Sequence, residues 1–299
     1  MVVQHNITAM NSNRMLGLTT SAQAKSTEKL SSGYKINRAA DDAAGLAISE
    51  KMRRQIRGLT QASANAQDGI SCVQTAEGAL NEVHDMLQRI NELAVKGETA
   101  TLTSTDRSYI QTEVQQLMSE IDRVRSTTTF NEQNLLDGNF TGKALQVGAE
   151  AGQHISITIN DMSSKGLLKL ADNNQDSVKG TTLTEEVYSN FYTDFKKDEI
   201  STVKVESDFG SLNKAVKAML QEVSKQRSDL GAIQNRLEHT ISNLDNIVEN
   251  TTSAEAAIRD TDVATEMVKY ANNNILQQAG TSMLSQANQS NQLALSLLG

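Results

Sequence analysis

Apolar residues recur at alternating steps of three and four through residues 46–94, in a chain of 299 residues that contains no proline. The apolar positions of this series are Met52, Ile56, Leu59, Ala66, Ile70, Val73, Ala76, Leu80, Val83, Leu87, Ile90 and Ala94. This spacing is typical of a coiled-coil seam, and a proline inside such a helix would break it. We therefore predict one helix of about 50 residues that ends at Gly97, with a stammer-like shift of the seam between Ile70 and Ala76.

Two further segments show the same periodicity. Thr103-Ser-Thr-Asp106 has the form of a helix cap, and it precedes Ile110, Val114, Leu117, Ile121 and Val124. The C-terminal half carries Leu220, Val223, Leu230, Leu237, Ile241, Leu244 and Val248, with Arg227 and Gln234 as polar members of the series. Three long seams in one chain favour a helical bundle or rod in which the N-terminal and C-terminal helices are neighbours.

The middle of the chain has a different character. Residues 138–180 hold six of the 17 glycines, and His154-Ile-Ser-Ile-Thr-Ile159 alternates as a strand does. Residues 172–210 hold nine acidic and four basic residues, which is a net −5 of the total −8. Four of the ten aromatic residues, Tyr188, Phe191, Tyr192 and Phe195, cluster there. We expect a small exposed insert whose aromatic residues form either its own core or a binding patch.

Both ends of the chain are nearly free of charge. Residues 270–299 have no charged residue, and the first 24 residues have only Arg14. Such helix-capable segments carry too little apolar surface to fold well alone, but burial against other copies would leave no charge unpaired. We expect the two ends to pair with each other in an assembly; the alternative is a pair of disordered tails.

No constellation of residues indicates catalysis or a metal or cofactor site. The four histidines are scattered, no H-E-x-x-H, P-loop or G-x-S-x-G motif occurs, and the single Cys72 excludes an internal disulfide framework. Cys72 is expected to be a packed small hydrophobic residue, and the adjacent Asp41 and Asp42 are expected to cap the helix that begins near Ala43.

The charge balance and the hydropathy exclude further classes of function. A net charge of −8 argues against nucleic-acid binding through a broad basic surface, and the cluster Lys51-Met-Arg-Arg54 with Arg57 is expected to be a solvated helix face. No stretch approaches the roughly 18 apolar residues of a membrane span. The N-terminus has neither the basic region nor the apolar region of a cleavable signal peptide.

Two long motifs resemble those of a known family. LSSGYKINRAADDAAGLAISEKMRRQIRGLTQASANAQDGIS (30–71) is similar to the N-terminal signature of bacterial flagellins. QRSDLGAIQNRLEHTISNLDNIVENTTSAEAAIRDTDVATEMVKY (226–270) and ILQQAGTSMLSQANQ (275–289) are similar to the C-terminal signature. The resemblance covers about residues 1–165 and 210–299 and leaves only the middle insert unmatched.

The resemblance implies a mainly α-helical subunit that polymerises with itself into the extracellular flagellar filament, with no enzyme activity and no cofactor. Terminal segments 1–44 and 256–299 would line an inner tube, and 45–170 with 211–255 would form a rod domain that includes a small β element. Residues 171–210 would be a short outer insert. The implied partners are the flagellar junction and cap proteins, the export apparatus, which needs no cleaved signal peptide, and an export chaperone at the C-terminal segment.

A second implication of the resemblance is recognition by host Toll-like receptor 5. The family's receptor-contacting stretches look like LQRINELAV (87–95) and IQTEVQQL (110–117). Carried over residue by residue, Arg89, Leu93 and Glu113 would form the primary contact; the alternative is that all three serve rod packing. For the whole chain, the alternative functions are a hook–filament junction protein and a secreted adhesin or immune ligand.

Overall fold

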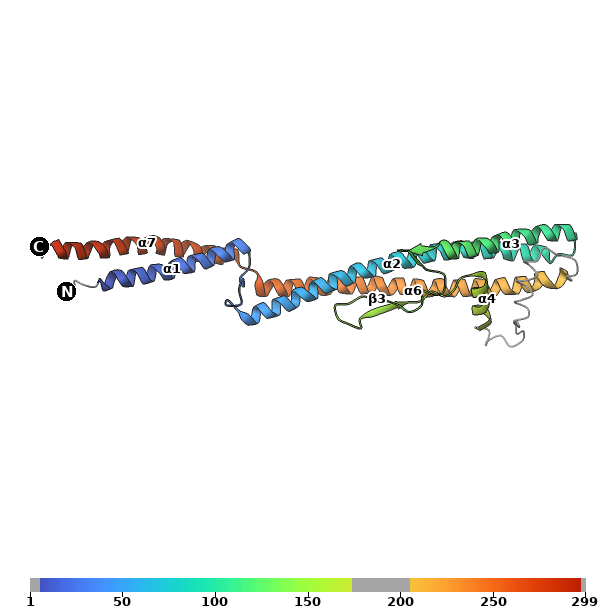
Figure 1. Cartoon of the computed structure of the whole chain (residues 1–299), viewed down its shortest axis with the longest axis horizontal. Helices are drawn as coiled ribbons and strands as arrows, with labels where there is room; N and C mark the ends of the chain where they lie inside the picture. The colour runs from blue at the N-terminus through green and yellow to red at the C-terminus, as the bar shows by residue number, and fades with distance from the viewer. Residues whose placement is uncertain (1–5, 174–204, 297–299) are drawn as a thin grey trace. The chain divides into compact units, whose positions relative to one another are not determined.

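The fold is known from a computed structural model, which describes residues 6–173 and 205–296 (Figure 1). Contacts divide the chain into two compact units: residues 1–57 with 247–299 form unit 1, and residues 58–246 form unit 2. The four clustered aromatic residues of the expected insert lie outside the described residues.

Two helices of 55 residues each dominate the structure: α2 (Ala43–Gly97) and α6 (Val205–Arg259). The predicted length of the first helix and its end at Gly97 are confirmed. Asp42 caps α2 by accepting a hydrogen bond from the Gly45 backbone N–H at 2.9 Å, as expected. Asp41 does not cap α2; its carboxylate instead accepts from backbone N–H groups of the preceding turn.

Within unit 2, α2 and α6 pack against each other in antiparallel directions. The Glu77 carboxylate lies 3.6 Å from the Arg227 guanidinium, whereas Gly97, farther along α2, meets the ring of Phe209, farther back along α6. A Cβ at Gly97 would lie 2.6 Å from the Phe209 ring, so glycine is required for this close approach. The two helices therefore run in opposite directions along one shared seam.

The buried seam of α2 differs in phase from the one predicted. Its members, at unbroken steps of three and four, are Leu59, Ala62, Ala66, Gly69, Val73, Ala76, Leu80, Val83, Leu87, Ile90 and Ala94. Ile70, which the prediction placed in the seam, is only half-buried, and Gly69 takes its place. A Cβ at Gly69 would collide with Leu145 and touch Leu237. The predicted stammer is therefore wrong, because small residues fill the seam where its neighbours come closest.

The seam of α6 also contains an unexpected polar member. Gln226 is buried, whereas the neighbouring Arg227 is half-buried and pairs with Glu77. The Gln226 side-chain oxygen accepts from the Asn160 amide at 3.1 Å, and its nitrogen donates to the Thr158 carbonyl oxygen at 3.0 Å. A buried amide is tolerated here because both of its ends are hydrogen-bonded.

Short elements connect the long helices of unit 2. Helix α3 (Ser104–Thr127) is followed by the paired strands β1 (Thr129–Phe130) and β2 (Gln133–Asn134). Strands β3 (Lys143–Gln146) and β4 (His154–Ile157) form an antiparallel hairpin, which confirms the predicted strand.

Helix α4 (Ser164–Asn173) follows the hairpin, and the described part of unit 2 has one large core and a smaller cluster of Ala66, Ile155 and Leu237. Its most completely buried side chains are Leu80, Leu87, Ile90, Ile121, Leu135, Leu136, Ile159, Met162, Leu167, Leu212, Met219 and Leu230. Cys72 lies in the same core, and burial raises the pKa of its thiol, so the expectation of a packed hydrophobic residue is confirmed.

In unit 1, α1 (Ile7–Ser32) and α7 (Val263–Ser296) lie side by side (Figure 1). Helix α1 ends at Gly33, which has a positive φ of 77° and donates its N–H to the Lys29 carbonyl oxygen. The expectation that the two ends of the chain pair is thus met within one copy. The prediction of a mainly helical fold with a small β element is confirmed, and the five-segment division of the chain stays a prediction.

A substitution in the seam measures how much the helical core contributes. We expect Leu87→Ala to lower the free energy of unfolding by about 2–5 kcal/mol, because Leu87 is fully buried and its loss leaves a cavity. Val95→Ala, on the exposed face of the same helix, should change it by less than about 0.5 kcal/mol. Urea denaturation followed by circular dichroism measures both, and equal losses would contradict the assigned seam.

Candidate functional site

A capping box marks the start of α3 after the turn that follows α2. Thr103 and Asp106 form a reciprocal capping box: the Thr103 hydroxyl accepts from the Asp106 backbone N–H at 3.2 Å, and the Asp106 carboxylate accepts from the Thr103 backbone N–H at 3.1 Å. The same carboxylate also accepts from the Thr103 hydroxyl at 2.7 Å. This cap fixes where α3 begins, and hence which residues of α3 face α2.

Arg89 of α2 and Glu113 of α3, two of the predicted receptor-contact residues, are brought together. The Arg89 Nε and Nη2 atoms donate to one Glu113 carboxylate oxygen at 3.0 and 2.9 Å, and Nη1 donates to Glu92 at 3.2 Å. The bonds to Glu113 first, and to Glu92 second, raise the pKa of Arg89. The side chains of Arg89 and Glu113 remain 51% and 45% exposed, so this pair contributes little to stability and presents charge to solvent.

Leu93, the third predicted contact residue, is buried. It is only 3% exposed and belongs to the core cluster of unit 2, so its side chain is not at the surface beside Arg89 and Glu113. Of the two exposed large apolar residues in the described part of unit 2, Tyr109 is 69% exposed and lies four positions before Glu113, on the same side of α3, whereas Val95 lies six positions after Arg89, on another side of α2. Sequence reasoning missed these two because it placed the surface by motif and did not consider helix phase.

A second candidate surface covers α1 and α7. The exposed large apolar residues of these helices are Ile7, Met10, Met15, Leu18, Val263, Met267, Val268, Ile275, Leu276 and Met283. Single exposed apolar residues are ordinary, but this many on two helices that together carry six charged residues indicates a surface made for burial. This is the physical counterpart of the uncharged ends seen in the sequence.

Specific polar contacts hold α1 against α7. The Ser26 hydroxyl donates to the buried Glu266 carboxylate at 2.7 Å, and the Asn6 side-chain amide donates to the Ala287 carbonyl oxygen at 3.0 Å. The bond from Ser26 is the main cause that lowers the pKa of Glu266, and Lys269 adds to it. Leu16 packs close to Gly280, where a Cβ would lie 3.3 Å away. These contacts fix the relative register of the two helices.

In unit 1, the segment between α1 and α2 contacts the end of α6 around Arg259. The Lys35 backbone N–H donates to the Arg259 carbonyl oxygen at 2.6 Å, and the Thr261 N–H donates to the Gly33 carbonyl oxygen at 2.9 Å. The Arg259 guanidinium stacks over the Tyr34 ring, 4.5 Å from its centre, and donates to Glu50 at 3.0 Å. Arg259 is therefore the first cause of the lowered pKa of Glu50.

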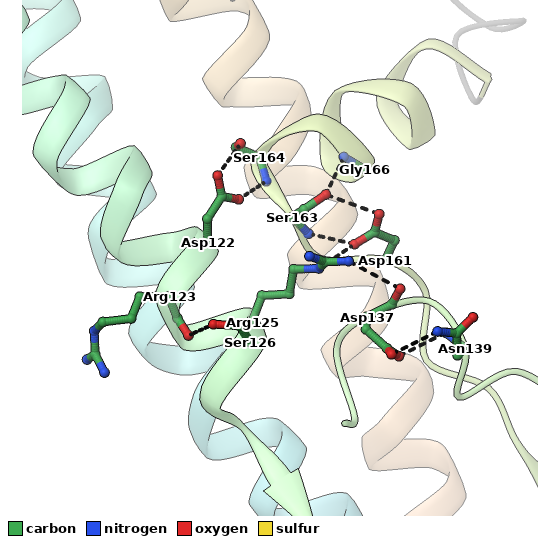
Figure 2. Close-up of polar contacts among 10 residues, drawn as sticks. All are labelled: Asp122, Arg123, Arg125, Ser126, Asp137, Asn139, Asp161, Ser163, Ser164 and Gly166. Carbon is green, nitrogen blue, oxygen red and sulfur yellow. Dashed lines mark hydrogen bonds and ion pairs between the residues drawn. The ribbon is translucent and has the colours of Figure 1, made fainter. Parts of the chain in front are cut away.

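Figure 2 shows a polar network in unit 2 that joins α3, the segment after β2, the segment between β4 and α4, and the start of α4. Asp161 accepts from Arg125 Nε at 3.1 Å and from the Ser163 backbone N–H at 3.0 Å, while Asp122 accepts from the Ser164 N–H at 2.9 Å. Cβ atoms at Gly138 or Gly166 would crowd Asp161. Donors already occupy these carboxylates, so the network is a structural clamp, and sequence reasoning did not predict it.

The described residues contain no group of three or more histidine, cysteine, aspartate or glutamate side chains able to hold a metal ion. Among those same residues, no helix is both long and apolar enough to cross a membrane.

Comparison with known protein families finds two matches in this chain. Residues 3–141 match the bacterial flagellin N-terminal helical region, and residues 213–298 match the bacterial flagellin C-terminal helical region. Together these matches cover well over half of the chain.

Individual relatives agree with this match. A flagellin of Halalkalibacterium halodurans is 47% identical over 298 residues, and a flagellin of Bacillus subtilis is 47% identical over 311 aligned positions; both alignments cover 100% of each chain. A structure assigned to a flagellar hook-associated protein of Vibrio parahaemolyticus has a TM-score of 0.56 at 14% identity, and it covers 74% of this chain and 100% of that one. This last likeness concerns the fold alone.

The capping box that positions α3 predicts a pH dependence. The Thr103 hydroxyl, and after it the Thr103 backbone N–H, lower the pKa of Asp106. A depressed folded-state pKa gives stability that is present above the unfolded aspartate pKa of about 3.9 and is lost as the pH falls through the folded value. Asp106→Asn should therefore unfold at lower urea than the unchanged chain at pH 7, and the difference should shrink at pH 2.5.

Glu82→Gln removes an exposed carboxylate that makes no ion pair with any described residue, and it serves as the control. Its urea midpoint should follow that of the unchanged chain at both pH values. A constant difference between Asp106→Asn and the unchanged chain at the two pH values would contradict the capping role.

Proposed function

Because the chain belongs to the bacterial flagellin family, and is thus a structural, non-enzymatic subunit of the extracellular flagellar filament, we propose that the exposed faces of α1 and α7 join copies within it. The observation that carries this proposal is the apolar surface on two helices whose outer parts, residues 7–24 of α1 and 270–296 of α7, carry Arg14 as their one charged residue. Burying that surface between copies releases water from apolar side chains, and residues 1–24 and 270–299 bring only the charge of Arg14 into the contact.

The layers of the filament follow from the same proposal. Segments 1–44 and 256–299 line the inner tube, 45–170 and 211–255 form the surrounding rod layer, and 171–210 faces outward. The distribution of charge supports this order, since residues 1–24, with Arg14 alone, and the uncharged residues 270–299 suit a buried layer, and an acidic segment suits a solvated one.

The partners outside the filament also belong to this proposal. The chain passes through the export apparatus, is held by an export chaperone at its C-terminal segment, and meets the junction and cap proteins during assembly. Of these contacts, the C-terminal one is best supported, because the apolar residues exposed on α7 need cover before assembly.

The alternative of a hook–filament junction protein is not favoured, because the full-length relatives at 47% identity are flagellins. The alternative of an adhesin or immune ligand depends on the insert, whose aromatic cluster lies outside the described residues.

We further propose that host Toll-like receptor 5 binds unit 2 at Arg89 and Glu113. Their preassembled pair supports this, because it offers a forked guanidinium and a carboxylate on one exposed surface at the α2–α3 contact. Leu93, the third residue of the proposed site, acts from beneath by holding that part of α2 in place. Tyr109, one helical turn before Glu113, supplies exposed apolar area beside the charged pair.

Removal of residues 270–299 tests the assembly role of α7. The truncated chain should form no filaments, because it loses much of the uncharged apolar face, while unit 2 should keep its helix content. Electron microscopy after seeding with filament fragments, together with circular dichroism, measures both. Filaments of normal length from the truncated chain would contradict the proposed role of the ends.

The receptor site is tested by single substitutions in the monomer. Arg89→Ala and Glu113→Ala should each weaken binding to the purified receptor ectodomain by about tenfold or more, as expected of central interface residues. Arg123→Ala is the matched control, because Arg123 is an equally exposed arginine of α3 whose ion pair with Glu120 stays within one helix. Biosensor affinities decide the matter: unchanged binding by both site variants would rule the site out.

A further inference from the structure

The outer face of α2 in unit 2 carries a row of acidic residues. We call Asp68, Glu82 and Asp85 the acidic stripe; the small residues Ser71, Thr75 and Gly78 lie between them on the same helix face. All six residues are exposed, and a Cβ at Gly78 would meet nothing within 4 Å. From Gly58 to Gln88 the sequence has no lysine or arginine. From Gly58 to Gln88 this face therefore carries only acidic charge, and it ends at Arg89, which pairs with Glu113 of α3.

The outer face of α6 in the same unit has the opposite sign. We call Lys214, Lys217, Lys225 and Arg236 the basic stripe; they recur at steps that keep them on one side of the helix, and all four are exposed. The residues between them on this face, Gln221, Ser228 and Ala232, are uncharged. Asp229, at the edge of the stripe, is the only exposed acidic residue of α6 from residue 209 to residue 236.

The charges of the two stripes are not used within the described chain. None of the ion pairs between described residues includes a member of either stripe. The one ion pair between α2 and α6 in unit 2, from Arg227 to Glu77, involves half-buried side chains beside the seam. The stripes are therefore available to a partner.

The packing of the two helices places the stripes on opposite sides of the α2–α6 pair. Each stripe lies on the face opposite its own helix's buried seam, and the two seams face each other. The stripes also occupy the same stretch of the unit. Gly69, next to Asp68, is level with Leu237, next to Arg236, and Glu77 is level with Arg227.

We propose that neighbouring copies in the filament dock side by side through these surfaces, with the acidic stripe of one copy against the basic stripe of the next. Such a contact joins two different surfaces. A docked pair therefore still has a free basic stripe on one copy and a free acidic stripe on the other, and the contact can repeat without closing. Like-charged stripes repel each other, which disfavours face-to-face dimers formed by one surface with itself. The small side chains of the acidic stripe allow the long lysine side chains to approach.

Charge reversal tests the contact in seeded growth at fixed ionic strength, with seeds made from each chain itself. Glu82→Lys/Asp85→Lys reverses the acidic stripe, and Lys217→Glu/Lys225→Glu reverses the basic stripe. Each double variant should elongate at least about tenfold more slowly, because like charges then face each other during encounter. A chain with all four substitutions should recover to within about threefold of the unchanged chain, since the complementarity is restored with its sign inverted.

A matched control separates the contact from net charge. Glu82→Lys/Asp85→Lys combined with Arg54→Glu/Arg57→Glu has the same net charge as the four-substitution chain but leaves the basic stripe unchanged, so it should stay slow. Circular dichroism verifies that each chain is folded, and the neutral pairs Glu82→Gln/Asp85→Asn and Lys217→Gln/Lys225→Gln replace any that is not. Normal growth of either single-stripe variant, no recovery in the four-substitution chain, or equal recovery in the control would overturn the proposal.

Discussion

The antiparallel contact between α2 and α6 in unit 2 is the interaction on which that unit depends. Its seam is made of regular steps of three and four, and small residues take positions where a neighbour comes close: Gly69 beside Leu145 and Leu237, and Gly97 beside the Phe209 ring. Close approach lets two helices share one continuous core, and α3 and the segments around the hairpin add their apolar residues to the same core. With few aromatic residues in the chain, the length of this seam, more than large side chains, supplies the buried area.

Because the seam excludes charged side chains, these lie on the outer faces of the helices. There they fall into two groups. Some charges are satisfied within the chain, as in the Arg89–Glu113 pair across α2 and α3. Others, such as Asp68 on α2 and Lys225 on α6, make no ion pair with any described residue. Exposed ion pairs add little to stability, so selection for folding does little to fix the arrangement of charged residues on these outer faces. Binding to a partner explains this arrangement more directly.

The sequence predicted what depends on local chemistry and missed what depends on contact between distant segments. The end of α2 at Gly97 and the cap at Thr103 follow from neighbouring residues, and both are confirmed. The seam phase near Ile70 was mispredicted because an isoleucine looks more suitable for a core than a glycine, until a partner crowds the position. For the candidate site, the motif predicted the neighbouring Arg89 and Glu113, but helix phase buries Leu93. The Asp161 network joins separate segments, and no periodic pattern of residues in the sequence predicts it.

The two units present different kinds of surface, and the difference bears on how such a chain avoids non-specific aggregation. In the described part of unit 2, Val95 and Tyr109 are the only exposed large apolar residues, whereas α1 and α7 of unit 1 expose many. Apart from Tyr34, the exposed large apolar residues of the described chain lie on helices, whose backbone groups are already hydrogen-bonded, and the described strands are no longer than four residues. Short strands offer little edge for pairing with another chain. Apolar attraction then acts only between surfaces of defined helical shape, which favours ordered contacts between copies over the open-ended pairing of strands.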